Sequence, residues 1–210
     1  MNILSLDSSS PVASVAVVTF AENTETLLFE ENTPHARSDS SALFLSIQRA
    51  VSRCGTPDAL CVGLGPGSYN GLRASIAAAR AMATALDRPL HAIPSPLALP
   101  GPEEGFWVVG DARGGHLWIS CVKEGEFLES PLLITPQDAL LHLSTRPDFP
   151  VFGSSPVGEI CSITIATPSA SSLARLAHRC DPLYLSELTP EPLYLKPPHI
   201  TAPKKSTHTR

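Results

Sequence analysis

Short apolar runs and one helical repeat pattern organise the first half of the chain. The runs have the length and β-branched content of strands at residues 1–6, 12–20, 26–29, 59–64 and 90–93. Helical spacing of apolar residues predicts one helix from Ser38 or Asp39 to Cys54, and an alanine-rich helix over about 71–86. The first three strands follow one another closely, which indicates an antiparallel meander. Together these elements predict an α/β lobe over residues 1–95.

The second half of the chain is less regular, because 17 of the 21 prolines lie after residue 88. A hairpin is predicted from residues 106–111 and 116–122, joined around Gly114 and Gly115. Further along, the pattern predicts a helix at 136–142, a strand at 151–153, a helix at about 169–179 and an extended piece at 183–196. We therefore expect a smaller second lobe over residues 103–195.

The charge of the chain argues against nucleic-acid binding by this protein alone. The formal net charge is −5, and residues 1–195 carry 11 basic and 20 acidic side chains. Nucleic-acid binding rests on clustered Lys and Arg that neutralise phosphates. Residues 196–210 hold four basic residues and no acid. This proline-rich tail is predicted to be flexible, and a weak contact to RNA within a larger assembly is the alternative.

Cysteine and histidine patterns give no sign of a metal or redox centre. The five cysteines are scattered without a C-x-x-C pair, and the seven histidines never stand at the spacing of metal ligands. We therefore expect reduced thiols, no metal and no cofactor. No apolar run reaches the roughly 18 residues that a membrane helix needs, and the cytoplasm is the expected location.

A glycine-rich stretch at residues 63–73, GLGPGSYNGLR, stands where many proteins bind phosphate. A P-loop is excluded because Leu72 and Arg73 follow Gly71 in place of Lys and Ser or Thr. A dinucleotide-binding loop that starts at Gly65 would need glycine where Asn70 stands. A nucleophile elbow also fails, because Ser68 lacks the two flanking glycines. The stretch is therefore interpreted as a structural turn, shaped by Gly65, Gly67 and Gly71, with Arg73 at the start of the helix.

One aspartate ends the first predicted strand of each lobe. Asp7 and Asp111 stand where a two-lobed phosphotransferase places the carboxylates linked to its magnesium ion. Aspartate in a turn is nevertheless commoner than aspartate on a metal. The residues after Asp7, Ser8 to Pro11, include no glycine and are poorly suited to wrap a phosphate chain. Asp111 and Arg113 are therefore assigned to a structural hairpin or an inter-lobe ion pair.

Four stretches of the sequence resemble the TsaB (YeaZ) family across nearly the whole chain. They are ILSLDSSSPVASVAVV, GLGPGSYNGLRASIAAARAMATAL, DARGGHLW and PEPLYLK. The resemblance implies a two-lobed, actin-like ASKHA fold of the ribonuclease H-like kind, with a shortened second lobe. The sequence departs from the family in that short, proline-rich lobe and in Asn70, where threonine is common.

The resemblance also implies a function without catalysis. The family is the partner of TsaD in making N6-threonylcarbamoyladenosine at position 37 of tRNAs that read codons starting with A. It implies that TsaD carries the metal and the transfer chemistry, that TsaE supplies an ATPase, and that tRNA is reached only through the complex. The first lobe pairs with TsaD, and the same surface forms homodimers when the protein is alone.

The alanine-rich helix offers a surface for such a partner. Ala77 and Ala81 allow another helix to approach closely, and Phe44, Leu72 and Ile76 are predicted to supply apolar area. A small kinase or ATPase that uses Asp7 and the glycine loop is the alternative function. A peptidase of the M22 type is a second alternative, against which the missing histidine pair argues.

Overall fold

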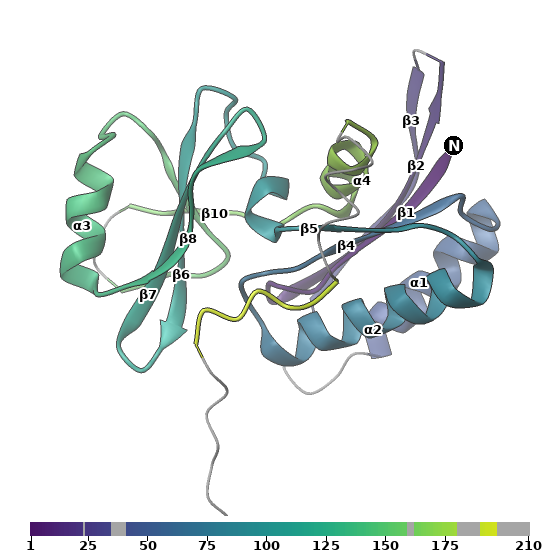
Figure 1. The fold of residues 1–210 in the computed structure, drawn as a ribbon, viewed down its shortest axis with the longest axis horizontal. Coiled ribbons are helices and arrows are strands. Elements are labelled where there is room, and N and C mark those ends of the chain that lie inside the picture. The colour runs from purple at the N-terminus through teal and green to yellow at the C-terminus, as the bar shows by residue number, and fades with distance from the viewer. Residues whose placement is uncertain (23, 35–40, 159–161, 180–189, 197–210) are drawn as a thin grey trace, which may run out of the picture.

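The computed structural model describes residues 1–22, 24–34, 41–158, 162–179 and 190–196, and it shows two lobes, each built on a five-stranded sheet (Figure 1). The strand order of the first sheet is β3-β2-β1-β4-β5. Its strands are β1 (Asn2–Asp7), β2 (Val12–Ala21), β3 (Thr24–Pro34), β4 (Ala59–Gly63) and β5 (Leu90–Ile93). The first three strands pair antiparallel, and β4 and β5 continue the sheet in parallel with β1. The predicted meander is confirmed.

Helices cover both faces of the first sheet. Helices α1 (Ser41–Cys54) and α2 (Tyr69–Leu86) lie on one face, and α4 (Ala170–Arg179) lies on the other (Figure 1). Each of the first two helices buries one stripe of small and apolar residues against the strands. The predicted start of α1 at Ser38 or Asp39 lies outside the described residues.

The second lobe is smaller. Its sheet has the order β10-β9-β6-β7-β8, and a short 3-10 helix, η1 (Ser95–Ala98), begins the connection from β5. The strands are β6 (Phe106–Arg113), β7 (His116–Lys123), β8 (Glu126–Ile134), β9 (Val151–Gly153) and β10 (Thr164–Ile165). Helix α3 (Pro136–Ser144) packs on the face turned away from the first lobe (Figure 1).

Helix α4 departs from the predicted division of the chain, which assigned residues 103–195 to the second lobe. Its buried residues Leu173, Ala174 and Ala177 pack against β1, β2 and β4 of the first sheet. Its first turn is fixed there too, because the Ala170 amide donates to Ser14 Oγ at 2.9 Å. The chain thus returns to the first lobe after β10.

The two sheets with their helices confirm the predicted two-lobed α/β fold. Of the described α-helices, α3 packs on the second sheet, whereas α1, α2 and α4 pack on the first. That the second lobe is shortened stays a prediction. The predicted flexible tail comprises residues 196–210. Of these, only Lys196 belongs to the described residues.

Candidate functional site

The glycine loop packs directly on the loop that follows β1. The Ser68 amide donates to the Ser9 carbonyl at 2.7 Å. A Cβ on Gly67 would collide with the Ser9 carbonyl oxygen, and a Cβ on Gly71 would collide with that of Ser8. These two positions therefore require glycine because two protein loops approach each other closely.

The start of α2 is occupied by the protein's own groups. Gly65, joined to Pro66 by a cis peptide bond, has a φ of +83°, a conformation that favours glycine. The Ser68 hydroxyl accepts a hydrogen bond from the Gly71 amide at 3.3 Å and so caps the helix. The Ser68 and Gly71 amides, which a phosphate cradle would direct at its ligand, thus donate to serine oxygens.

Asp7 is fully buried and is held by serine residues. Its Oδ1 accepts hydrogen bonds from the Ser9 amide at 2.8 Å and the Ser9 hydroxyl at 2.7 Å. Its Oδ2 accepts from the Ser95 hydroxyl at 2.6 Å, and Ser95 Oγ in turn accepts from the Gly65 amide at 2.9 Å. The carboxylate thereby ties the ends of β1, β4 and β5 together.

Asp111 and Arg113 lie at the exposed turn between β6 and β7. The Arg113 amide donates to Asp111 Oδ1 at 2.7 Å, and Arg113 has a φ of +59° at the turn. Among the ion pairs formed by described residues, none joins these two side chains. Their contact therefore belongs to the hairpin, and neither side chain forms an ion pair with another described residue.

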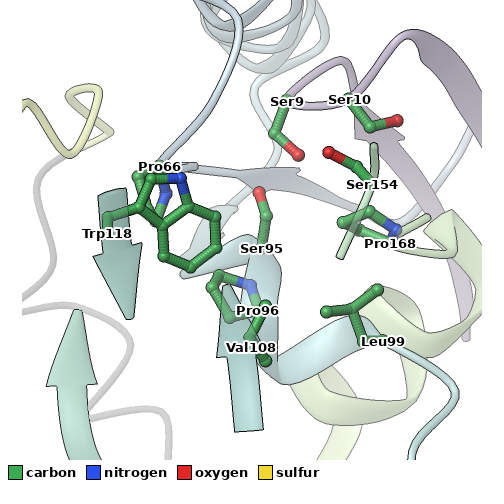
Figure 2. A pocket seen from close by; sticks show the side chains of 10 residues that line it. All are labelled: Ser9, Ser10, Pro66, Ser95, Pro96, Leu99, Val108, Trp118, Ser154 and Pro168. Atoms are coloured by element: carbon green, nitrogen blue, oxygen red, sulfur yellow. The ribbon is translucent and has the colours of Figure 1, made fainter. Parts of the chain in front are cut away.

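A small pocket lies between the lobes (Figure 2). Its empty space is about 290 Å³ with open solvent included, so the enclosed part is smaller than this. The lining residues are Ser9, Ser10, Pro66, Ser95, Pro96, Leu99, Val108, Trp118, Ser154 and Pro168. None of these side chains is ionisable, so the lining supplies no charge to a phosphate or to a phosphate-bound cation.

Metal ligands, reactive thiols and membrane-spanning helices are the other features that bear on function within the described residues. No group of three or more His, Cys, Asp and Glu side chains there has the geometry to hold a metal ion. Cys54 and Cys121 are free thiols, and burial raises the pKa of both, which disfavours the reactive thiolate. None of the helices described has the length and hydropathy that a membrane crossing requires.

Helix α1 leaves two large apolar side chains in solvent. Phe44 and Leu45 are each 51% exposed, although Leu43 and Ile47 on the same helix are buried. Arg49 forms an ion pair with Glu31 of β3 at 2.5 Å, which places the Arg49 side of α1 over the edge of the sheet. Phe44 lies on the opposite flank of the helix, toward α2. The sequence pattern identified Phe44 but missed Leu45, whose position outside the buried stripe was the available signal.

Ala77 and Ala81 of helix α2 are exposed, as a partner surface on this helix needs. Leu72 and Ile76 differ from their predicted role, because they are only 1% and 4% exposed and belong to the core of the first lobe. They share a helical stripe with Ala79 and Ala83, which faces the sheet. These two residues therefore hold the helix in place and offer no area to a partner.

We call the outward side of these two helices the α1–α2 face. It consists of Phe44, Leu45, Gln48, Ser52 and Arg53 on α1, and of Arg73, Ala77, Arg80, Ala81, Thr84 and Ala85 on α2. Both helices bury their other side against the same sheet (Figure 1). Their outward sides therefore point in the same direction, away from the sheet.

A C-terminal segment, residues 190–196, lies beside the start of α2. The Leu193 amide donates to the Leu64 carbonyl at 2.8 Å, and the Tyr194 and Tyr69 rings stand 5.3 Å apart. Burial, with a smaller effect of Tyr69, raises the pKa of Tyr194. Lys196 Nζ donates to the Arg113 carbonyl at 2.7 Å, and the segment thus connects the first lobe with the β6–β7 hairpin.

Comparison with known structures identifies the fold class. YeaZ from Pseudomonas aeruginosa superimposes with a TM-score of 0.72 at 22% sequence identity, covering 92% of this chain and 99% of that one. A second structure, a protein with similarity to peptidase YeaZ from the same organism, gives a TM-score of 0.68 at 21% identity, over 93% and 99% of the two chains. The chain therefore has the two-lobed fold of YeaZ.

Sequence comparison matches part of the chain to a family model and most of it to an uncharacterised relative. The family model described as TsaD, tRNA N6-adenosine threonylcarbamoyltransferase, matches residues 35–100, a segment that contains α1, the glycine loop and α2. An uncharacterised protein of Mycobacterium tuberculosis (strain ATCC 25618 / H37Rv) is 27% identical over 205 residues, covering 91% of this chain and 94% of that protein. The fold shared with YeaZ and the partial match to the TsaD model agree with the resemblance to the TsaB (YeaZ) family that the sequence motifs indicate.

Proposed function

We propose that this chain is a TsaB-type scaffold subunit that binds and activates TsaD in threonylcarbamoyl transfer to adenosine 37 of tRNAs reading codons that start with A. One observation carries the proposal. In a chain with the fold of YeaZ, the segment that matches the TsaD family model presents an exposed, partly apolar helix face.

The α1–α2 face has the properties of a protein–protein interface. Half-exposed Phe44 and Leu45 provide apolar area, and covering them by a partner would contribute about 1 kcal/mol each. The small side chains of Ala77 and Ala81 allow a partner helix to approach α2 closely. A face of this composition fits a helical partner better than it fits a small ligand.

The inter-lobe region supports a role without catalysis. The glycine loop is packed against Ser8 and Ser9, the pocket lining has no ionisable side chain, and Asp7 is held by serine hydroxyls. A kinase or ATPase needs groups that hold phosphate and magnesium at this position. We therefore assign the transfer chemistry to TsaD and no metal or cofactor to this chain.

The proposal includes the remaining members of the assembly. TsaE, the ATPase, engages the pair formed with TsaD, and tRNA is bound only through the complex. In the absence of TsaD, the same α1–α2 face forms a homodimer. We expect the complex to act in the cytoplasm.

Sedimentation velocity of this chain mixed with TsaD from the same organism tests the proposal. We expect a one-to-one complex that sediments faster than either protein, and no binding of magnesium-ATP to the isolated chain in calorimetry. Two separate boundaries in the mixture would contradict the scaffold function. Micromolar, magnesium-dependent ATP binding by the chain alone would favour the enzyme alternative.

A further inference from the structure

The two helices of the α1–α2 face carry charge of one sign. Residues 41–54 and 69–86 contain Arg49, Arg53, Arg73 and Arg80 and no Asp or Glu. The chain as a whole is acidic, with a net charge of −5. A positive face on an acidic protein is therefore a local feature of these two helices.

Most of this positive charge is not neutralised within the described chain. Arg49 is paired with Glu31, but Arg53, Arg73 and Arg80 form no ion pair with any described residue. Arg73 Nη1 donates to the neutral Tyr69 hydroxyl at 3.0 Å. Asp87 ends α2, but Arg88 follows it directly, so the pair adds no net charge.

The arginines border an apolar centre. On α2, Arg73 and Arg80 share one flank of the outward side, and Ala77 and Ala81 lie nearer its middle, as the helical repeat of 3.6 residues requires. On α1, Arg53 lies on the flank next to Arg49, and Leu45 lies at the middle. Interfaces commonly have this arrangement of an apolar centre with a polar rim.

We propose that the charge of the α1–α2 face favours a partner whose docking helices carry carboxylates over a second copy of this chain, so that the homodimer is the weaker of the two associations. The inference rests on the proposed function, because it describes the partner of that same face. A two-fold symmetric homodimer opposes identical patches, so the arginines of the two copies would meet like charges. An acid-bearing partner would meet them with opposite charge.

The two kinds of association therefore respond oppositely to salt. Dissolved salt screens exposed charges over about 8–10 Å at physiological ionic strength. Added salt weakens the attraction to an acid-bearing partner and slows its association. The same salt weakens the arginine–arginine repulsion and favours the homodimer.

The variant Arg80→Glu tests the inference, because Arg80 is exposed and forms no ion pair with any described residue. Lys123→Glu, at the β7–β8 turn of the second lobe, is its matched control, because it produces the same change in net charge away from the face. Association rates with TsaD are measured by stopped-flow fluorescence, and self-association by sedimentation equilibrium, each at low and high salt. Circular dichroism confirms that both variants are folded.

At low salt, Arg80→Glu is expected to slow association with TsaD by about tenfold and to strengthen self-association, while Lys123→Glu changes either by less than about twofold. A complex with TsaD that forms at rates independent of salt and of Arg80→Glu would overturn the charge inference and leave the scaffold function standing. Self-association of the unmodified chain that weakens as salt rises would also overturn it. Absence of any complex with TsaD would overturn both proposals.

Discussion

The variant Ala77→Gln is expected to bind TsaD about thirtyfold more weakly than the unmodified chain does. Ala77 lies on the outward side of α2, where a partner helix would pack closely. A glutamine side chain in such a contact costs about 2 kcal/mol through steric overlap. Glutamine is uncharged, so the loss reports close packing and not the charge of the face. Isothermal titration calorimetry with TsaD measures the change in Kd.

Ala21→Gln provides the control for this substitution. Ala21 is an exposed alanine at the end of β2, where it forms the tip of the hairpin with β3, away from the α1–α2 face (Figure 1). We expect its Kd for TsaD to stay within about twofold of the unmodified value, because surface substitutions outside an interface change little. Equal affinities of the Ala77→Gln variant and the unmodified chain would remove this part of α2 from the interface.

The variant Asp7→Ala is expected to lower the free energy of unfolding by about 3 kcal/mol. The substitution removes the acceptor for the Ser9 amide, the Ser9 hydroxyl and the Ser95 hydroxyl, all in a fully buried position. Leaving a buried donor without a partner costs about 1–3 kcal/mol, and local relaxation recovers part of the sum. Urea denaturation followed by circular dichroism measures the loss.

Asp111→Ala is the matched control, because Asp111 also ends a strand but is exposed and accepts one hydrogen bond, from the Arg113 amide. Its expected cost is below about 1 kcal/mol. Asp7→Asn is expected to lose less stability than Asp7→Ala, since an amide oxygen still accepts from Ser9. An Asp7→Ala variant as stable as the unmodified chain would show that Asp7 has no structural role and would return it to the list of candidate metal ligands.

Local patterns predicted most of the first lobe. Strands β1, β2, β4 and β5 stand within one or two residues of their predicted places, with β5 found at Leu90–Ile93 as expected. Strand β3 is longer than the predicted 26–29, because its polar residues also pair with β2. Strand β8 was not predicted from the sequence, because Glu126–Ile134 mixes charged and apolar residues and contains Pro131. Its place is set by pairing with β7, which is a tertiary contact.

Long-range packing determines the features of the structure that the sequence did not predict. The apolar stripe of α4 predicts an amphipathic helix, but no local feature tells which sheet will cover Leu173 and Ala174. Helix α2 has apolar residues on every side, so periodicity does not separate buried Leu72 and Ile76 from exposed Ala77. The burial of Asp7 depends on Ser95, which is 88 residues away in the sequence.

The glycine loop shows how a sequence feature and its physical cause differ. The sequence of the loop matches neither a P-loop nor a dinucleotide-binding loop. The structure explains Gly67 and Gly71 by the close approach of Ser8 and Ser9. The same loop begins the helix that carries Ala77 and Arg80. Loop packing and partner binding are thus joined in one segment, because the loop fixes the position of α2 on the sheet.

Threonylcarbamoyl transfer in a reconstituted system tests the scaffold function most directly. TsaD, TsaE, ATP and threonylcarbamoyl-adenylate are incubated with a tRNA that reads A-starting codons, with and without this chain, and the modified adenosine is quantified by mass spectrometry of the digested tRNA. We expect product only when this chain is present, and reduced product with Ala77→Gln at limiting concentration. Equal amounts of product with and without the chain would contradict its role as the activator of TsaD.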